Sequence, residues 1–72
     1  MTPAEVVWAY HTSLRHGAYW CWLCGRELGR SDGSEAELHE AVTTLRGELS
    51  DPASLRAFSA GLTEGQRKAP HE

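Results

Sequence analysis

Residues 18–28 read AYWCWLCGREL and are the most unusual part of this chain. They concentrate aromatic side chains, contain both cysteines of the sequence and include a glycine directly after the second cysteine. Aromatic residues are enriched in β-strands, and glycine is typical of a tight turn. We therefore expect residues 18–28 to form a short β-hairpin whose turn carries Cys21 and Cys24.

A first helix is expected before this hairpin. Thr2 and Glu5 have the spacing of a capping box, and Pro3 stands at the first helical position, where its missing N–H does no harm. The apolar periodicity that follows predicts a helix from Pro3 to about His16. Gly17 is then expected to end this helix in a left-handed conformation.

A second helix is expected at residues 35–49. Ser34 is a suitable N-cap, and acidic residues follow it in the first turn, where the helix dipole favours them. Four apolar residues then recur at a 4-3-4 spacing that places them on one face. These residues are Leu38, Val42, Leu45 and Leu49.

A shorter third helix is expected after the start signal at residues 50–52, with an end near Gly61 or Gly65. Residues 63–72 lack apolar periodicity and are expected to form a flexible tail. The prediction is thus one mainly α domain over residues 1–62, with a CxxC-containing hairpin between its first two helices. The apolar stripe of the third helix is Leu55, Phe58 and Leu62.

The motif Cys21-x-x-Cys24-Gly25 resembles the knuckle of zinc-finger and zinc-ribbon proteins, and the resemblance covers residues 19–28. In such knuckles, a tight turn directs two thiolates at one ion. A structural Zn²⁺ site needs four ligands, so histidines must supply the other two. The chain has no second cysteine pair, which makes the histidine positions decisive.

His39 and His16 are the expected third and fourth zinc ligands, and His11 is the alternative to His16. His39 follows Cys24 at a spacing close to that of a Cys2His2 finger, and His16 is near Cys21 in the sequence. A structural zinc suits a chain of 72 residues, because it contributes about 10–16 kcal/mol of binding energy to folding. A Cys21–Cys24 disulfide would contribute only about 2 kcal/mol.

Two other interpretations of the cysteines stay open. The Trp-Cys-x-x-Cys order of residues 20–24 is similar to that of thioredoxin-like proteins, which would imply a thiol-disulfide redox function. The chain is too short for the thioredoxin sheet, however. The simplest interpretation is that both cysteines are small buried apolar residues.

The expected function is non-catalytic. We find no nucleophile-base pair and no glycine-rich phosphate loop, and a zinc with four protein ligands leaves no open position for water. The aromatic residues Trp20 and Trp22 are the expected anchors for a partner. The sequence therefore predicts a small zinc-binding regulator or adaptor that docks on a larger protein.

The charge and hydropathy of the chain limit the classes of partner that it can bind. The formal net charge is -3 and the sequence has no basic stripe, so we expect a protein partner and not nucleic acid. A small zinc-finger-like regulator that binds nucleic acid is the alternative function. No apolar run is long enough to cross a membrane, so we expect a soluble cytoplasmic protein. The apolar stripe of residues 38–49 would also suit the seam of a weak homodimer.

Overall fold

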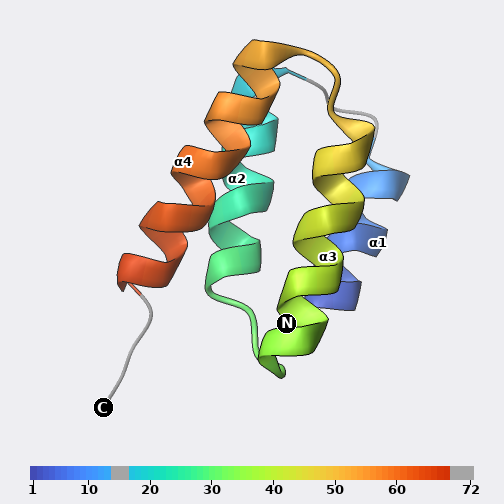
Figure 1. The fold of residues 1–72 in the computed structure, drawn as a ribbon, viewed down its shortest axis with the longest axis vertical. Coiled ribbons are helices and arrows are strands. Elements are labelled where there is room, and N and C mark those ends of the chain that lie inside the picture. The colour runs from blue at the N-terminus through green and yellow to red at the C-terminus, as the bar shows by residue number, and fades with distance from the viewer. Residues whose placement is uncertain (14–16, 69–72) are drawn as a thin grey trace.

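In the computed structural model, which describes residues 1–13 and 17–68, every regular element of the described chain is an α-helix (Figure 1). The expected hairpin of residues 18–28 is wrong, because these residues form the second helix. The bundle therefore has four helices in its described part, and no zinc knuckle is formed. The helices are α1 (Pro3–Thr12), α2 (Ala18–Gly29), α3 (Glu35–Glu48) and α4 (Pro52–Lys68).

The helices alternate in direction along the chain. Helices α1 and α3 run one way and α2 and α4 run the other way, so each of these two pairs is parallel (Figure 1). Helix α4 packs chiefly on α2, and α1 packs on both α2 and α3. The chain start is tied to the loop after α2, since the Asp32 N–H donates to the Met1 carbonyl oxygen at 2.8 Å.

The expected capping box at Thr2 is confirmed, and the expected N-cap Ser34 also forms a capping box. Before α1, the Thr2 hydroxyl accepts from the Glu5 N–H at 3.2 Å, and the Glu5 carboxylate accepts from the Thr2 N–H at 2.8 Å. Before α3, Ser34 and Glu37 make the same reciprocal pair. These local bonds satisfy N–H groups that a helix start leaves without partners, which explains why the sequence identified both starts.

Helix α4 also begins as expected, because the Asp51 carboxylate accepts from the Ser54 N–H at 3.0 Å. The helix continues to Lys68 and so includes residues 63–68, which were expected to belong to the flexible tail. The cause is tertiary packing, since Gly65 lies directly against the backbone of Arg26 in α2. A prediction from the spacing of apolar side chains misses this contact, because glycine has no side chain.

Helix α2 has a glycine at its N-cap position and therefore no side-chain cap. Gly17 precedes the helix with φ 115°, and no side chain satisfies the first N–H groups. The sequence assigned Gly17 to the end of the first helix, but α1 ends at Thr12, with Ser13 as its C-cap. Residues 14–16, which include the expected end of that helix at His16, lie outside the described residues.

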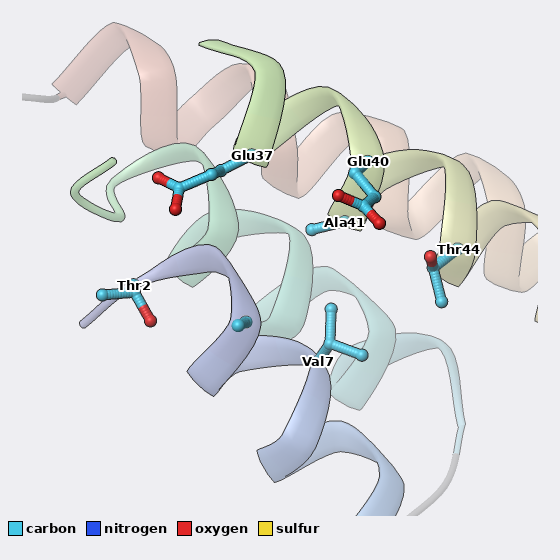
Figure 2. A pocket seen from close by; sticks show the side chains of 7 residues that line it. Thr2, Val7, Glu37, Glu40, Ala41 and Thr44 are labelled. Carbon is cyan, nitrogen blue, oxygen red and sulfur yellow. The ribbon is translucent and has the colours of Figure 1, made fainter. Parts of the chain in front are cut away.

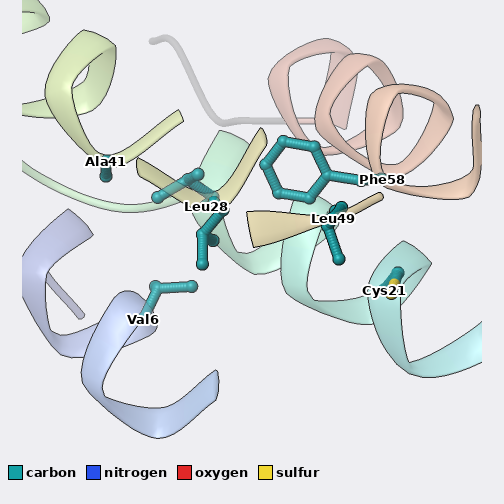
Figure 3. Packing of buried hydrophobic residues seen from close by; sticks show 7 residues of the cluster. Val6, Cys21, Leu28, Ala41, Leu49 and Phe58 are labelled. Atoms are coloured by element: carbon teal, nitrogen blue, oxygen red, sulfur yellow. The ribbon is translucent and has the colours of Figure 1, made fainter. Parts of the chain in front are cut away.

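The core lies between the two parallel pairs and takes side chains from all four helices (Figure 3). Phe58 and Leu28 are among its largest fully buried side chains. Leu45 and Leu49, from the predicted stripe of the second expected helix, are also buried, whereas Leu38 and Val42 pack at the edge of the core. The 4-3-4 stripe thus faces the bundle interior.

Helices α2 and α4 approach each other closely through glycines. A Cβ atom at Gly25 would lie 2.9 Å from the Leu62 nitrogen and against the Phe58 carbonyl oxygen, and one at Gly29 would lie 2.5 Å from the Leu62 carbonyl oxygen. On α4, Gly61 lies against the Trp22 backbone in the same manner. We call these four residues, Gly25, Gly29, Gly61 and Gly65, the glycine seam.

Candidate functional site

Cys21 and Cys24 lie one helical turn apart on the inner side of α2. Both are free thiols, and their exposed fractions are only 3% and 8%. The Cys21 N–H bonds to the Gly17 carbonyl oxygen as part of the helix, not of a turn. Because the pair is inside a helix and faces the core, it lacks the open geometry of a knuckle.

Burial raises the pKa of the Cys24 thiol to about 11, and negative charge at Cys21 and then at Glu27 acts in the same direction. Burial also raises the pKa of Tyr10, and the charges of the two cysteines add to this shift. The thiolate is the form of cysteine that binds zinc and attacks disulfides. The environment of Cys24 therefore opposes both metal binding and redox chemistry.

The raised pKa of Cys24 predicts a loss of stability in alkali. The folded protein holds this proton more tightly than the unfolded chain, whose thiol pKa lies near 9.0. The stability contributed by the group is complete below pH 9 and is lost as the pH rises toward 11. Two pKa units correspond to about 3 kcal/mol. Solvent screening reduces this value, so we expect the free energy of unfolding to fall by about 1–2 kcal/mol over this interval.

Urea unfolding at pH values between 7 and 11 measures this loss. The Cys24→Ala variant is the control, and the stability of each protein is compared with the stability of that same protein at pH 7. We expect a shallower fall in the variant. Some fall remains there, because Tyr10 also titrates with a raised pKa. Equal falls in the two proteins would contradict the assignment to Cys24.

The expected histidine ligands do not join the cysteines in the described structure. His39 is exposed on α3, where it lines a shallow surface hollow with neighbours from its own helix. His11, the alternative ligand, has its Nε2 at 2.7 Å from both carboxylate oxygens of Glu48 on α3. His16 lies outside the described residues.

Across residues 1–13 and 17–68, no group of three or more His, Cys, Asp or Glu side chains is placed to hold a metal ion. The described residues therefore do not fit a structural zinc site. The arrangement that the sequence predicted required a turn at the cysteines, and the helix replaces that turn.

Trp22, one of the two expected anchors, belongs to an ordered stack on the surface of α2. The ring of Tyr19 stacks on that of Trp22, with centroids 6.2 Å apart and an interplanar angle of 15°. The guanidinium carbon of Arg26 lies over the Trp22 ring at 5.3 Å from its centroid. We call Tyr19, Trp22 and Arg26 the aromatic stack.

Tyr19 is the exposed end of this stack, with 72% of its surface accessible. Tyr19 was not among the residues that the sequence predicted as anchors. The signal was the spacing of the three residues, since positions 19, 22 and 26 fall on one face of a helix but on no single face of a strand. A similarly exposed aromatic residue, Trp8 at 69%, lies on α1.

Trp20, the other expected anchor, is half-buried and lines an apolar groove between α1 and α2. The groove has a volume of about 200 Å³ and opens to solvent. Its only charged side chain is that of Glu27. The lining residues are Met1, Val6, Ala9, Tyr10, Trp20, Leu23, Cys24 and Glu27.

A larger and more polar hollow of about 380 Å³ lies between α1 and α3 (Figure 2). Glu37 and Glu40 reach it from α3, and Thr2 and Val7 face them from the N-terminal part of the chain. The Glu37 carboxylate already accepts the Ser34 N–H at 2.9 Å as part of the capping box. Its role is therefore accounted for by the start of α3.

The fold and its surface define a small all-α domain of four helices in the described part of the chain. No helix in that part is both long and apolar enough to cross a membrane. Comparisons with protein-family models, with curated proteins and with solved structures find no match.

Proposed function

We propose that this chain is a non-catalytic protein-binding domain, a regulator or adaptor that uses the aromatic stack to dock on a larger protein. The observation that carries the proposal is the exposure of Tyr19 on an ordered platform of Trp22 and Arg26. Tyrosine, tryptophan and arginine are the residue types that dominate binding energy at protein interfaces. Here all three stand within two turns of one helix.

The contacts within the stack support the same function. Side chains that are already ordered lose less conformational entropy on binding, so more of their contact energy appears as affinity. The Arg26 guanidinium is held over Trp22 and lies 3.5 Å from the Glu27 carboxylate. A partner would therefore meet a surface that needs little rearrangement.

The net charge of -3 favours a protein partner over nucleic acid. The raised pKa of Cys24 argues against the thiol-disulfide alternative. Two free, buried cysteines also suit a reducing compartment such as the cytoplasm, where we place the protein.

Zinc is not part of the proposal. Because His16 lies outside the described residues, metal binding by the whole chain stays an untested prediction. Native mass spectrometry of protein purified without chelator tests it, and a metal-free mass would rule zinc out.

The test of the proposed function is Tyr19→Ala. Affinity capture from the source cells identifies the partner, and calorimetry with the purified partner gives the dissociation constant. We expect the variant to bind about 30-fold more weakly or worse, which corresponds to the loss of about 2 kcal/mol typical of an interface anchor. Its thermal unfolding should be close to that of the wild type, because Tyr19 is largely exposed.

Thr43→Ala is the matched control, since Thr43 is exposed on α3. It should bind as the wild type does. Trp8→Ala extends the test to the outer face of α1. If the Tyr19 variant retains wild-type affinity, the proposed surface is wrong, and loss of affinity in the Trp8 variant alone would place the docking surface on α1.

A further inference from the structure

The attachment of α4 to the rest of the bundle is unusual. This helix packs chiefly on α2, and the contact joins backbone to backbone along the glycine seam. The register is regular: Gly25 meets Phe58 and Leu62, and Gly29, one turn later, meets Leu62 and Gln66. Each helix thus presents a surface that fits the other along its length.

This contact is also selective. Any side chain at Gly61 would meet the Trp22 and Arg26 backbones, which cannot turn aside as a flexible side chain can. The exposed surface of an ordinary helix, with side chains at these positions, would not fit there. The helix that does fit is an α4 with glycines at positions 61 and 65, which every copy of this chain carries.

The connection between α3 and α4 has only three residues, Leu49, Ser50 and Asp51. Leu49 is buried in the core, so the hinge is limited to Ser50 and Asp51, which are both exposed. Asp51 precedes Pro52, and a residue before proline favours extended backbone. Opening of this hinge would carry α4 away from its own α2 as one unit.

We propose that α4 exchanges between two copies of this chain, so that the α4 of one copy packs on the glycine seam of the other copy's α2. The exchanged dimer would make the same contacts between α2 and α4 as the monomer, and Phe58 of each α4 would enter the core of the other copy, so no packing is lost. Its cost is the entropy of association together with any change at the hinge. The proposal involves no contact of Tyr19 and is therefore independent of the proposed function.

Concentration decides between the two forms. A short connection holds α4 near its own α2 at an effective concentration of about millimolar order, so the dimer should become populated at about 1 mM protein and be minor at about 10 µM. We expect light scattering after size-exclusion chromatography to show this increase when the wild type is refolded at the two concentrations.

The length of the hinge provides a sharper variant. Deletion of Ser50 leaves two residues between α3 and α4, the buried Leu49 and the Asp51 that precedes Pro52. This shorter connection should hinder the return of α4 to its own α2, so we expect the dimer dissociation constant to fall by about 100-fold or more. Insertion of Gly-Gly-Ser after Ser50 is the matched control and should stay monomeric. Wild-type and Ser50-deleted chains that keep native helicity and remain monomers at about 1 mM would overturn the proposal.

Complementation tests the exchanged contact directly. One full-length variant carries Gly25→Leu and Gly29→Leu, and the other carries Gly61→Leu and Gly65→Leu. Each alone should lose its cooperative thermal transition. Refolded together, they should form a heterodimer in which the intact α4 of the first variant meets the intact α2 of the second, while the reciprocal contact joins two substituted helices and stays unpacked. We therefore expect a cooperative transition to return with about half of the wild-type amplitude, since one of two contacts is intact. A mixture whose melting curve is the sum of the separate curves would also count against exchange.

Discussion

Replacement of Gly61 by alanine is expected to destabilise the protein by about 3 kcal/mol. The variant should therefore be largely unfolded at 37 °C and show no cooperative transition above that temperature. The added Cβ would meet the carbonyl group of Trp22, with its carbon at 2.9 Å, and the Arg26 nitrogen at 3.0 Å. These atoms all belong to the backbone of a packed helix, so α2 and α4 must separate to make room. Separation would weaken the contact along the whole seam.

The size of this effect follows from the size of the protein. A core in a chain this short supplies only about 3–5 kcal/mol of net stability. A loss of about 3 kcal/mol leaves little or none. Thermal unfolding followed by circular dichroism, together with urea titration at 10 °C, measures the change.

Gly47→Ala is the control for the chemical change itself. Gly47 lies within α3, and no neighbouring atom lies within 4 Å of the position of an added Cβ. Alanine is the better helix former, so this variant should be more stable by up to about 1 kcal/mol. If Gly61→Ala and Gly47→Ala unfold at the same temperature, close packing at the seam is not what stabilises α4.

The helices that the sequence identified are those whose signals are local. The capping boxes at Thr2 and Ser34 join residues three positions apart, and the stripe from Leu38 to Leu49 is visible within one helix. Such features depend on nearby residues alone, so they can be recognised before the fold is known. The boundaries of α3 accordingly differ from the expectation by one residue.

Helix α2 could not be recognised in this way. Gly17 gives it no side-chain cap, and its aromatic residues and glycines are typical of strands and turns. Gly25 and Gly29 serve the contact with α4, which lies far away in the sequence. The repeated four-residue spacing of glycines in both segments was the available signal, since it places them on one face of each helix.

The predicted zinc knuckle was wrong because residues 18–28 were expected to form a hairpin and not a helix. Two cysteines in a turn point outward together, whereas Cys21 and Cys24 in this helix point toward the core. Trp22 was expected to be an anchor for a partner, and that role stays a prediction. Tyr19 and Arg26 contact Trp22 because the segment is helical, which places all three residues on one face.

Replacement of Phe58 by alanine is expected to cost about 3–5 kcal/mol, the range for truncating a buried phenylalanine. Phe58 is 1% exposed and belongs to the same buried cluster as Leu45, Leu49 and Leu28 (Figure 3). Among residues 52–67 of α4, Phe58 is the one fully buried large side chain. The glycine seam fixes how closely α4 approaches α2, while Phe58 supplies apolar burial that the glycines cannot.

Phe58→Leu separates lost volume from lost hydrophobicity, and it should cost about 1–2 kcal/mol, because leucine fills much of the same space. Amide hydrogen exchange then distinguishes two ways of failing. The milder leucine variant, which should stay folded, is the one to measure: if Phe58 serves mainly to hold α4, this variant should lose protection in α4 before α1 and α3. If it is the centre of the whole core, protection should fall in all four helices together. We expect the second result, because Phe58 shares one cluster with residues of α1, α2 and α3. Unchanged protection in Phe58→Leu and an unchanged melting temperature in Phe58→Ala would contradict both.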